Sequence, residues 1–273
     1  MKKTILITGA SSGMGKETAL QLIKEGHIVY GAARRLENMQ EIADLGGHAI
    51  HMDVTDENSL RQGVDQIIKE KGRIDVLVNN AGYAVYGSVE DVTMEDARKQ
   101  FDVNIFGLAR LTQLVLPHMR SQESGTIINI SSMGGKIYTP LGAWYHATKH
   151  ALEGWSDCLR LETKPFGINV VIVEPGLIAS EFGEVLNQPL QERSRGGAYE
   201  DLASKIVKSL EASYAKPNAS SPSSVISKVI SRAIQSKKPK TRYVAGKMAK
   251  PVMMMRRLLS DRAFDKLIMS QVK

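Results

Sequence analysis

Ser132, Tyr145 and Lys149 are three side chains whose types and spacing could carry out a proton transfer. Residues 126–131 form a β-branched run that predicts a buried strand, and Ser132 follows directly at its C-terminal end. Tyr145 and Lys149 are four residues apart in a stretch predicted to be helical, so they share one face. A phenol titrates near ~10, and a neighbouring ammonium lowers its pKa. The set therefore predicts a general acid–base site at which Ser132 binds the substrate oxygen that Tyr145 protonates.

The Tyr-x-x-x-Lys spacing occurs a second time, at Tyr243 and Lys247. Gly246 argues against a helix through this second copy, and no serine at a strand end precedes it. We therefore interpret Tyr243 and Lys247 as structural and expect the chemistry at Tyr145 and Lys149.

Alternation of strands and helices along the chain predicts the elements that would position these residues. Helical stretches separate strands predicted at residues 3–8, 27–33, 48–52, 74–79, 126–131 and 168–174. This order is typical of a parallel sheet covered on both faces. Residues 93–121 are expected to be helical with a break around Asn104, and residues 226–234 and 241–245 to form a last helix and an edge strand.

The composition fits one soluble α/β domain. The chain has 273 residues, of which 42% are hydrophobic and 24% charged. Its lone cysteine, Cys158, excludes an internal disulfide and favours a reducing, cytoplasmic location. The first apolar run is too short for a signal peptide, and no apolar span approaches the ~20 residues of a membrane helix. The net charge of +7 belongs to the tail, because residues 237–273 hold 11 Lys or Arg against 2 Asp, a net of +9.

A glycine-rich turn, Gly9-x-x-x-Gly13-x-Gly15, lies between the first strand and a helix predicted at residues 14–25. Glycines let the backbone approach a phosphate, and a helix N-terminus supplies N–H donors. The second strand ends at Ala33, where an NAD site would have an acid, and Arg34 follows. Since a guanidinium suits a 2′-phosphate, this predicts NADP(H) in preference to NAD(H). The alternative is that Arg34 belongs to a solvated charge pair at a helix start.

These motifs, in this order, resemble the short-chain dehydrogenase/reductase family over about residues 3–180. The likeness rests on the glycine turn after Thr8, Asp53, the stretch Asn79-Asn80-Ala81-Gly82, Asn104, Ser132, Tyr145-x-x-x-Lys149 and Pro175-Gly176. It implies an α/β fold, a Rossmann-type doubly wound parallel sheet of about seven strands in a single domain. It also implies a nicotinamide dinucleotide at the C-terminal edge of the strands and no metal ion.

The resemblance also assigns roles to individual residues. Tyr145 is implied as the general acid/base, Lys149 as the group that binds the nicotinamide ribose, and Asn104 as the holder of a relay water. Ser132 matches the family serine, because Ser131 would face the other side of the strand. Ser180 stands where a threonine commonly binds the carboxamide. The implied cofactor contacts are Gly9, Ser11, Ser12, Gly13, Met14, Gly15, Arg34, Asp53, Val54, Asn80, Ala81, Gly82, Tyr145, Lys149, Pro175, Gly176, Ile178 and Ser180.

The C-terminal part of the chain bears on the substrate. We expect a catalytic domain over residues 1–247, with a variable substrate lid at about 181–222, and a basic, Met-rich extension over 248–273 on or near the substrate pocket. Pro251 is expected to limit any helix to the residues after it. Residues 236–267 loosely resemble the 17β-hydroxysteroid and retinol dehydrogenase-like subgroup. Flexible methionines adapt to apolar ligands, which predicts a steroid, retinoid or lipid-like ketone or aldehyde.

The leading hypothesis is an NADP(H)-dependent oxidoreductase that interconverts a carbonyl and an alcohol. One alternative is a 3-oxoacyl-carrier-protein reductase, which the roughly 28 residues beyond Ala245 disfavour. Another is a non-catalytic NADP-sensing regulator, a class that tends to lose the Ser/Tyr/Lys set. Expected partners are a small-molecule substrate and further copies of the chain, in a homodimer or homotetramer, but no nucleic acid. The basic tail predicts a weak peripheral contact with an anionic membrane surface.

Overall fold

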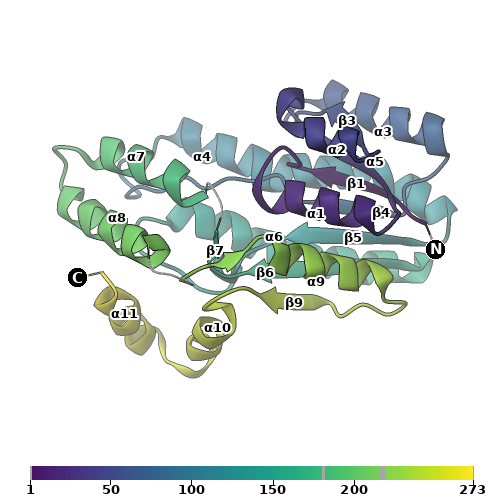
Figure 1. Ribbon diagram of the computed structural model, residues 1–273. Coiled ribbons are helices and arrows are strands. Elements are labelled where there is room, and N and C mark those ends of the chain that lie inside the picture. Colours follow the sequence, from purple (N-terminus) through teal and green to yellow (C-terminus); the bar gives the residue numbers. More distant parts are fainter. Residues whose placement is uncertain (1, 180–181, 216–218, 273) are drawn as a thin grey trace.

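A seven-stranded parallel sheet forms the centre of the protein, with strand order β3-β2-β1-β4-β5-β6-β9 (Figure 1). The computed structural model describes residues 2–179, 182–215 and 219–272. The strands are β1 Thr4–Thr8, β2 Ile28–Ala33, β3 His48–His51, β4 Val76–Asn79, β5 Gly125–Ile130, β6 Ile168–Pro175 and β9 Arg242–Ala245. The direction of strand order reverses between β1 and β4, which is where open α/β sheets bind ligands. The prediction of a single-domain Rossmann-type sheet is confirmed.

Helices cover both faces of the sheet (Figure 1). One face packs against α1 Gly13–Lys24, α2 Gln40–Asp44 and α9 Ser224–Gln235. The other packs against α3 Glu57–Lys71, α5 Leu108–Ser121 and α6 Ala143–Thr163. Neighbouring strand residues point to opposite faces, so Ile5 and Ile7 join the first core and Leu6 joins the second. This is why the strands are apolar throughout rather than alternating.

The predicted helix break at Asn104 is a π-helical segment instead. Helix α4 Met94–Phe101 continues through η2 Asp102–Gly107, a π-helix, into α5 without leaving helical geometry. Single π-helical turns within α-helices often mark functional sites. The expectation of a change in regular structure at Asn104 is thus met by a widened turn and not by an interruption.

Two helices, α7 Phe182–Ser194 and α8 Glu200–Ala215, occupy the region predicted as a lid. They lie together at one end of the molecule (Figure 1). The pair β7 Ile178–Ala179 and β8 Ser221–Pro222 forms a second, two-stranded sheet at the base of this segment. Of the predicted lid, residues 181 and 216–218 fall outside the described residues.

The tail folds into two helices, α10 Ala249–Leu258 and α11 Asp261–Ser270, which together we call the C-terminal arm. The helix begins two residues before Pro251, so the expectation that Pro251 would exclude the preceding residues was wrong. A proline fits in the first turn because its missing N–H would have no helical partner there. Among the described residues no helix combines the length and apolarity that crossing a membrane requires.

The C-terminal arm docks on the loop that precedes the Tyr145 helix. Phe264 of α11 is fully buried and packs edge-to-face on the Tyr138 ring at 5.3 Å between centroids. The Arg256 guanidinium lies 5.3 Å from the Tyr138 ring centroid and 5.4 Å from that of Phe264. The Tyr138 hydroxyl donates to Asp265 at 2.9 Å. Val272, beyond α11, packs against the apolar cluster of α7 and α8.

Candidate active site

Most of the predicted site residues that the structure describes lie at or just after the C-terminal ends of parallel strands, whereas Asn104 lies in the π-helix and Tyr145 and Lys149 lie near the start of α6. The glycine turn follows β1, Arg34 follows β2, and Asp53 and Val54 lie just beyond β3. Asn80–Gly82 and Ser132 follow β4 and β5, Pro175 ends β6, Gly176 comes directly after it, and Ile178 begins β7. Because parallel strands end at one edge of the sheet, these groups gather there. Ser180 lies outside the described residues.

The glycine turn is held by the end of β4. Asn80 Nδ2 donates to the carbonyls of Thr8 at 3.0 Å and Gly9 at 3.2 Å. The Thr8 hydroxyl in turn accepts from the backbone N–H groups of Asn80 and Ala81, at 3.1 and 3.0 Å. A Cβ at Gly15 would lie 2.2 Å from the Gly9 carbonyl oxygen and 2.4 Å from Asn80 Nδ2. Only glycine therefore fits at position 15, and the turn has the close backbone geometry that a dinucleotide site needs.

A cavity of about 330 Å³ opens between the glycine turn and the segment after β2. Its lining is polar and includes two cationic side chains, Lys16 and Arg35; the full set is Ser11, Ser12, Lys16, Arg35, Glu37, Asn38, Gln40 and Glu41. Lys16 pairs with Glu41 at 2.9 Å. The two serines were predicted contacts, whereas Lys16 and Arg35 were not. Two carboxylates, Glu37 and Glu41, balance the two cations, so the lining carries no formal net charge.

Arg34 itself is exposed and influences Asp53 electrostatically. Burial raises the pKa of the Asp53 carboxyl, but hydrogen bonds from the Thr55 backbone and hydroxyl and the Arg34 charge more than offset this, so the pKa is lowered. Asp53 is therefore ionised and fixed by Thr55 at 2.9 and 2.8 Å. Asp53 and Arg34, predicted separately, lie within electrostatic reach of one another.

Tyr145 and Lys149 share one face of α6 and are both nearly buried, with 9% and 8% of their surfaces exposed. Lys149 Nζ donates to the Ile130 carbonyl at 2.9 Å and lies 6.0 Å from the Tyr145 ring centroid. Burial lowers the pKa of Lys149 to about 8, against the attraction of Glu153. The lysine is thus a largely desolvated cation beside the tyrosine, still protonated at neutral pH.

Asn104 and Lys149 meet at Gly82. A Cβ at Gly82 would lie 3.1 Å from Asn104 Oδ1 and 3.8 Å from Lys149 Nζ. Asn104 Nδ2 donates to the Tyr83 carbonyl at 2.9 Å and to the Thr148 hydroxyl at 3.1 Å, and Oδ1 accepts from Tyr83 N–H at 3.1 Å. These bonds fix the asparagine between the π-helical segment, the turn after β4 and α6. Its role with a relay water stays a prediction.

Ser132 begins the loop that leads to α6. Its hydroxyl accepts from the Gly134 N–H at 3.0 Å, which caps the short helix η3 Met133–Gly135. Gly134 packs on the Tyr145 ring, since a Cβ there would lie 3.1 Å from Tyr145 Cε1. Ser131, in contrast, is buried, and its hydroxyl has no hydrogen-bond partner among the described residues. The two serines thus occupy different surroundings, as the strand alternation predicted.

His146 closes the loop between Ser132 and Tyr145. Its Nε2 accepts from the Thr139 N–H at 3.1 Å, so Nδ1 carries the proton and donates to the Gly134 carbonyl at 2.8 Å. Burial lowers the pKa of His146 and keeps the ring neutral. The sequence does not predict this positioning role, because nothing in a lone histidine on a helix indicates that its two nitrogens bind two points of one loop.

Apolar side chains lie next to Tyr145 and form what we call the apolar wall. The Tyr86 ring lies 6.0 Å from the Tyr145 ring between centroids. Tyr86 also packs on a cluster formed by the loop before α6 and by α7 and α8, with Leu141, Leu190, Ala203, Ile206 and Val207 as its buried members. Arg193 of α7 binds the Tyr86 carbonyl at 3.1 Å and Asp96 at 3.2 Å. No sequence motif indicated Tyr86.

The turn after β6 is braced by the segment that leads into the C-terminal arm. The Leu177 N–H donates to the Lys247 carbonyl at 2.9 Å, and a Cβ at Gly176 would lie 2.1 Å from that oxygen. Tyr243 lies on β9, and its hydroxyl accepts from the Lys240 N–H at 3.2 Å. Gly246 has a φ of +89°, so no helix joins Tyr243 to Lys247. The second Tyr-x-x-x-Lys copy is therefore not a helical pair.

Residues 3–191 match the family model described as short chain dehydrogenase. The chain belongs to the short-chain dehydrogenase family. A 3-ketodihydrosphingosine reductase from Bacteroides thetaiotaomicron is 45% identical over 208 residues, covering 76% of this chain and 74% of that protein. A short-chain dehydrogenase from Streptomyces avermitilis superposes with a TM-score of 0.81 at 33% identity, covering 97% of each chain. The protein is thus an oxidoreductase that acts on alcohol or carbonyl groups with a pyridine nucleotide.

A structure of serine dehydrogenase complexed with NADP+ is also similar to this chain. It has a TM-score of 0.75 and 26% identity, and covers 89% of this chain and 94% of its own. The glycine turn, the cavity beside it and the gathering of Asn104, Tyr145 and Lys149 at one sheet edge fit a dinucleotide of this kind.

Proposed function

We propose that the protein reduces apolar, lipid-like ketones or aldehydes with NADPH, and runs the reverse reaction on the corresponding alcohols. The observation that carries this proposal is the pair of Lys149 and Tyr145 beside an apolar wall that includes Tyr86, with Ser132 on the loop that packs on the Tyr145 ring. The similarity to a 3-ketodihydrosphingosine reductase supports a keto lipid as the substrate class.

Hydride transfer, proton transfer and orientation of the substrate would fall to different groups. When bound along the glycine turn, the nicotinamide would supply or accept a hydride. Tyr145 would donate a proton to the carbonyl oxygen, and the Ser132 hydroxyl would hold that oxygen in place. The Lys149 ammonium, held by the Ile130 carbonyl, would favour the phenolate left on Tyr145. The buried surroundings strengthen each of these electrostatic contacts.

A preference for NADP(H) is supported by the charges at the adenosine end of the site. Arg35 and Lys16 line the cavity beside Ser11 and Ser12, together with Glu37 and with Glu41, which pairs with Lys16. Arg34 precedes Arg35 in the chain. A 2′-phosphate bears negative charge and three acceptor oxygens, which guanidinium and ammonium groups bind well. No acidic side chain occupies position 33, where one would repel the phosphate.

The C-terminal arm would close the substrate site and set its chain-length preference. It reaches the site through Phe264 on Tyr138 and through Val272 on the lid cluster. Its outer face carries Met254 and Leu258, exposed by 61% and 74%, and the exposed basic residues Lys250 and Arg257 belong to the same helix. That face suits peripheral contact with an anionic bilayer, where each basic residue adds ~1 kcal/mol. Flotation with anionic vesicles but not zwitterionic ones is expected, and its loss in Met254→Asp is the check.

A panel of ketones and aldehydes of increasing chain length, assayed by nicotinamide absorbance with NADPH, tests the function. We expect higher kcat/KM for long apolar substrates, 3-ketodihydrosphingosine among them, than for short ones. Truncation after Lys247 should remove that preference, because it takes away Phe264 and Val272, while NADPH binding persists. Turnover of none of the carbonyls would contradict the proposal.

The less severe variant Phe264→Ala provides a check that does not remove the whole arm. It should weaken the chain-length preference in the same direction, whereas Met254→Ala on the outer face should not change it. If the truncated protein shows the same preference among substrate chain lengths as the full-length protein, the arm has a structural role only.

A further inference from the structure

Four ionisable side chains recur at every fourth residue of α6: Tyr145, Lys149, Glu153 and Asp157. Residues at this spacing lie one above another on a helix. Glu153 comes one turn after Lys149, and its side chain is only 5% exposed. Burying a carboxylate is costly unless cations or hydrogen bonds compensate. The buried carboxylate of Glu153 therefore requires cationic partners, and one of them, Lys136, lies on the loop that follows Ser132.

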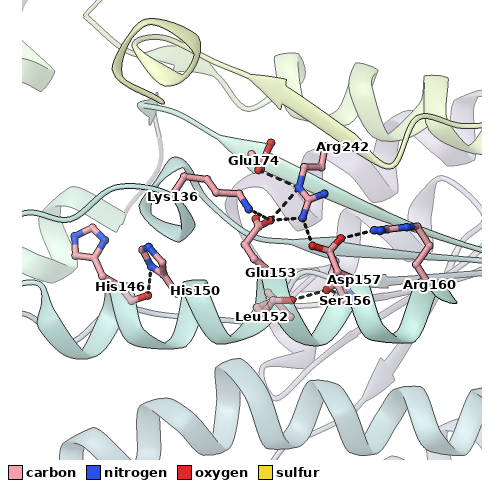
Figure 2. A network of polar contacts seen from close by, with 11 residues as sticks. Lys136, His146, His150, Leu152, Glu153, Ser156, Asp157, Arg160, Glu174 and Arg242 are labelled. Atoms are coloured by element: carbon pink, nitrogen blue, oxygen red, sulfur yellow. Dashed lines mark hydrogen bonds and ion pairs between the residues drawn. The ribbon is translucent and has the colours of Figure 1, made fainter. Parts of the chain in front are cut away.

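Glu153 is the centre of a charged network that joins four segments (Figure 2). Its Oε2 contacts Lys136 Nζ at 2.9 Å and both Arg242 Nε and Nη2 at 3.1 Å. Lys136 belongs to the loop after Ser132, and Arg242 to β9. Arg242 also binds Asp157 at 2.6 Å and lies 3.6 Å from Glu174 at the end of β6.

The carboxylate that acts on Lys149 from one helical turn away is Glu153. Burial, and then the charge of Glu153, raise the pKa of Glu174 to about 7, so Glu174 is partly neutral near pH 7. Both cations contact Oε2 of Glu153, whereas Oε1 is buried and has no hydrogen-bond partner among the described residues. For Lys149, burial favours the neutral amine and the attraction of Glu153 is the opposing influence.

We propose that Glu153 is a positioning residue that keeps Lys149 in its ammonium form, and that Lys136 and Arg242 set how strongly it does so. This inference rests on the proposed catalytic role of Lys149. Of the remaining charged members of the network, Asp157 lies one turn beyond Glu153 on α6, and both Asp157 and Glu174 affect Glu153 through their contact with or proximity to Arg242.

Glu153→Gln tests the inference because it keeps the shape and an acceptor oxygen for Lys136 and Arg242 but removes the charge. The alkaline limb of kcat/KM for carbonyl reduction should move to lower pH by about one unit, the usual effect of losing one nearby opposite charge. Asp157→Asn, the matched control in the same network, should move that limb much less, because Asp157 lies two helical turns from Lys149 and is paired with Arg242. Lys136→Met should move it to higher pH, since it leaves the charge of Glu153 less neutralised.

A direct titration separates this inference from the proposed function. The Lys149 Cε resonance of lysine-labelled protein, identified by its absence in Lys149→Met, can be followed against pH without cofactor or substrate. Its midpoint should fall by about one unit in Glu153→Gln and rise in Lys136→Met. If these shifts occur but the protein turns over no carbonyl substrate, the proposed function is contradicted and the role of Glu153 is supported. An unchanged midpoint in both variants, or an equal fall in Asp157→Asn, would overturn the role of Glu153.

Discussion

Tyr145→Phe is expected to lower kcat by ~10²–10⁴-fold, the usual contribution of a general acid–base group. The substitution removes only the hydroxyl and leaves the ring that packs on Gly134 and faces Tyr86 at 6.0 Å. The surroundings of Lys149 and the glycine turn should therefore persist, and with them the affinity for NADPH. Steady-state kinetics together with a fluorescence titration of NADPH measure the two effects separately.

Tyr243→Phe is the matched control, because Tyr243 also precedes a lysine by four residues. It lies on β9, where its hydroxyl accepts a hydrogen bond from the Lys240 backbone. The positive φ of Gly246 prevents a helix from joining Tyr243 to Lys247. This variant should retain native kcat. Near-native turnover in Tyr145→Phe would remove Tyr145 from the chemistry.

Arg34→Ala is expected to reduce kcat/KM with NADPH by roughly 10- to 100-fold and to leave the value with NADH nearly unchanged. A hydrogen bond to a charged group contributes about 1.5–3 kcal/mol, which corresponds to this range. The native enzyme should accordingly prefer NADPH. Equal kcat/KM for the two cofactors in the native protein would refute the predicted preference.

Arg35→Ala shows which of the two adjacent guanidinium groups carries the effect. Arg35 lines the cavity beside the glycine turn, whereas Arg34 lies near Asp53. If the larger loss with NADPH occurs in Arg35→Ala, the phosphate contact belongs to the cavity. Lys16 offers no equally clean control, because it already pairs with Glu41.

Local sequence patterns were sufficient for the sheet. Runs such as residues 126–131 and 168–174 are apolar on both faces because helices cover both sides of a parallel sheet. The C-terminal arm was less predictable. Pro251 was interpreted as a barrier although a first-turn proline is compatible with α10, and α11 is held by Phe264 and Arg256 on Tyr138, a residue more than a hundred positions away.

The candidate site likewise contains residues that local sequence patterns predict and residues that they do not. Tyr145, Lys149, Ser132 and the glycine turn have fixed spacings within single segments, so their sequence indicates them. Tyr86, His146 and Arg35 act through contacts between segments, which no local spacing encodes. Glu153 lies between these cases. Its spacing from Lys149 is visible in the sequence, but its burial and its pairing with Lys136 and Arg242 are not.

Transfer of deuterium from NADPH labelled at the reactive ring carbon tests the central claim most directly. Incubation of the protein with the labelled cofactor and a long-chain ketone should give an alcohol that carries deuterium on its carbinol carbon, in a single stereochemical form. Tyr145→Phe should abolish this product, and Tyr243→Phe should not. A product without deuterium, or labelled product formed at native rate by Tyr145→Phe, would contradict the account.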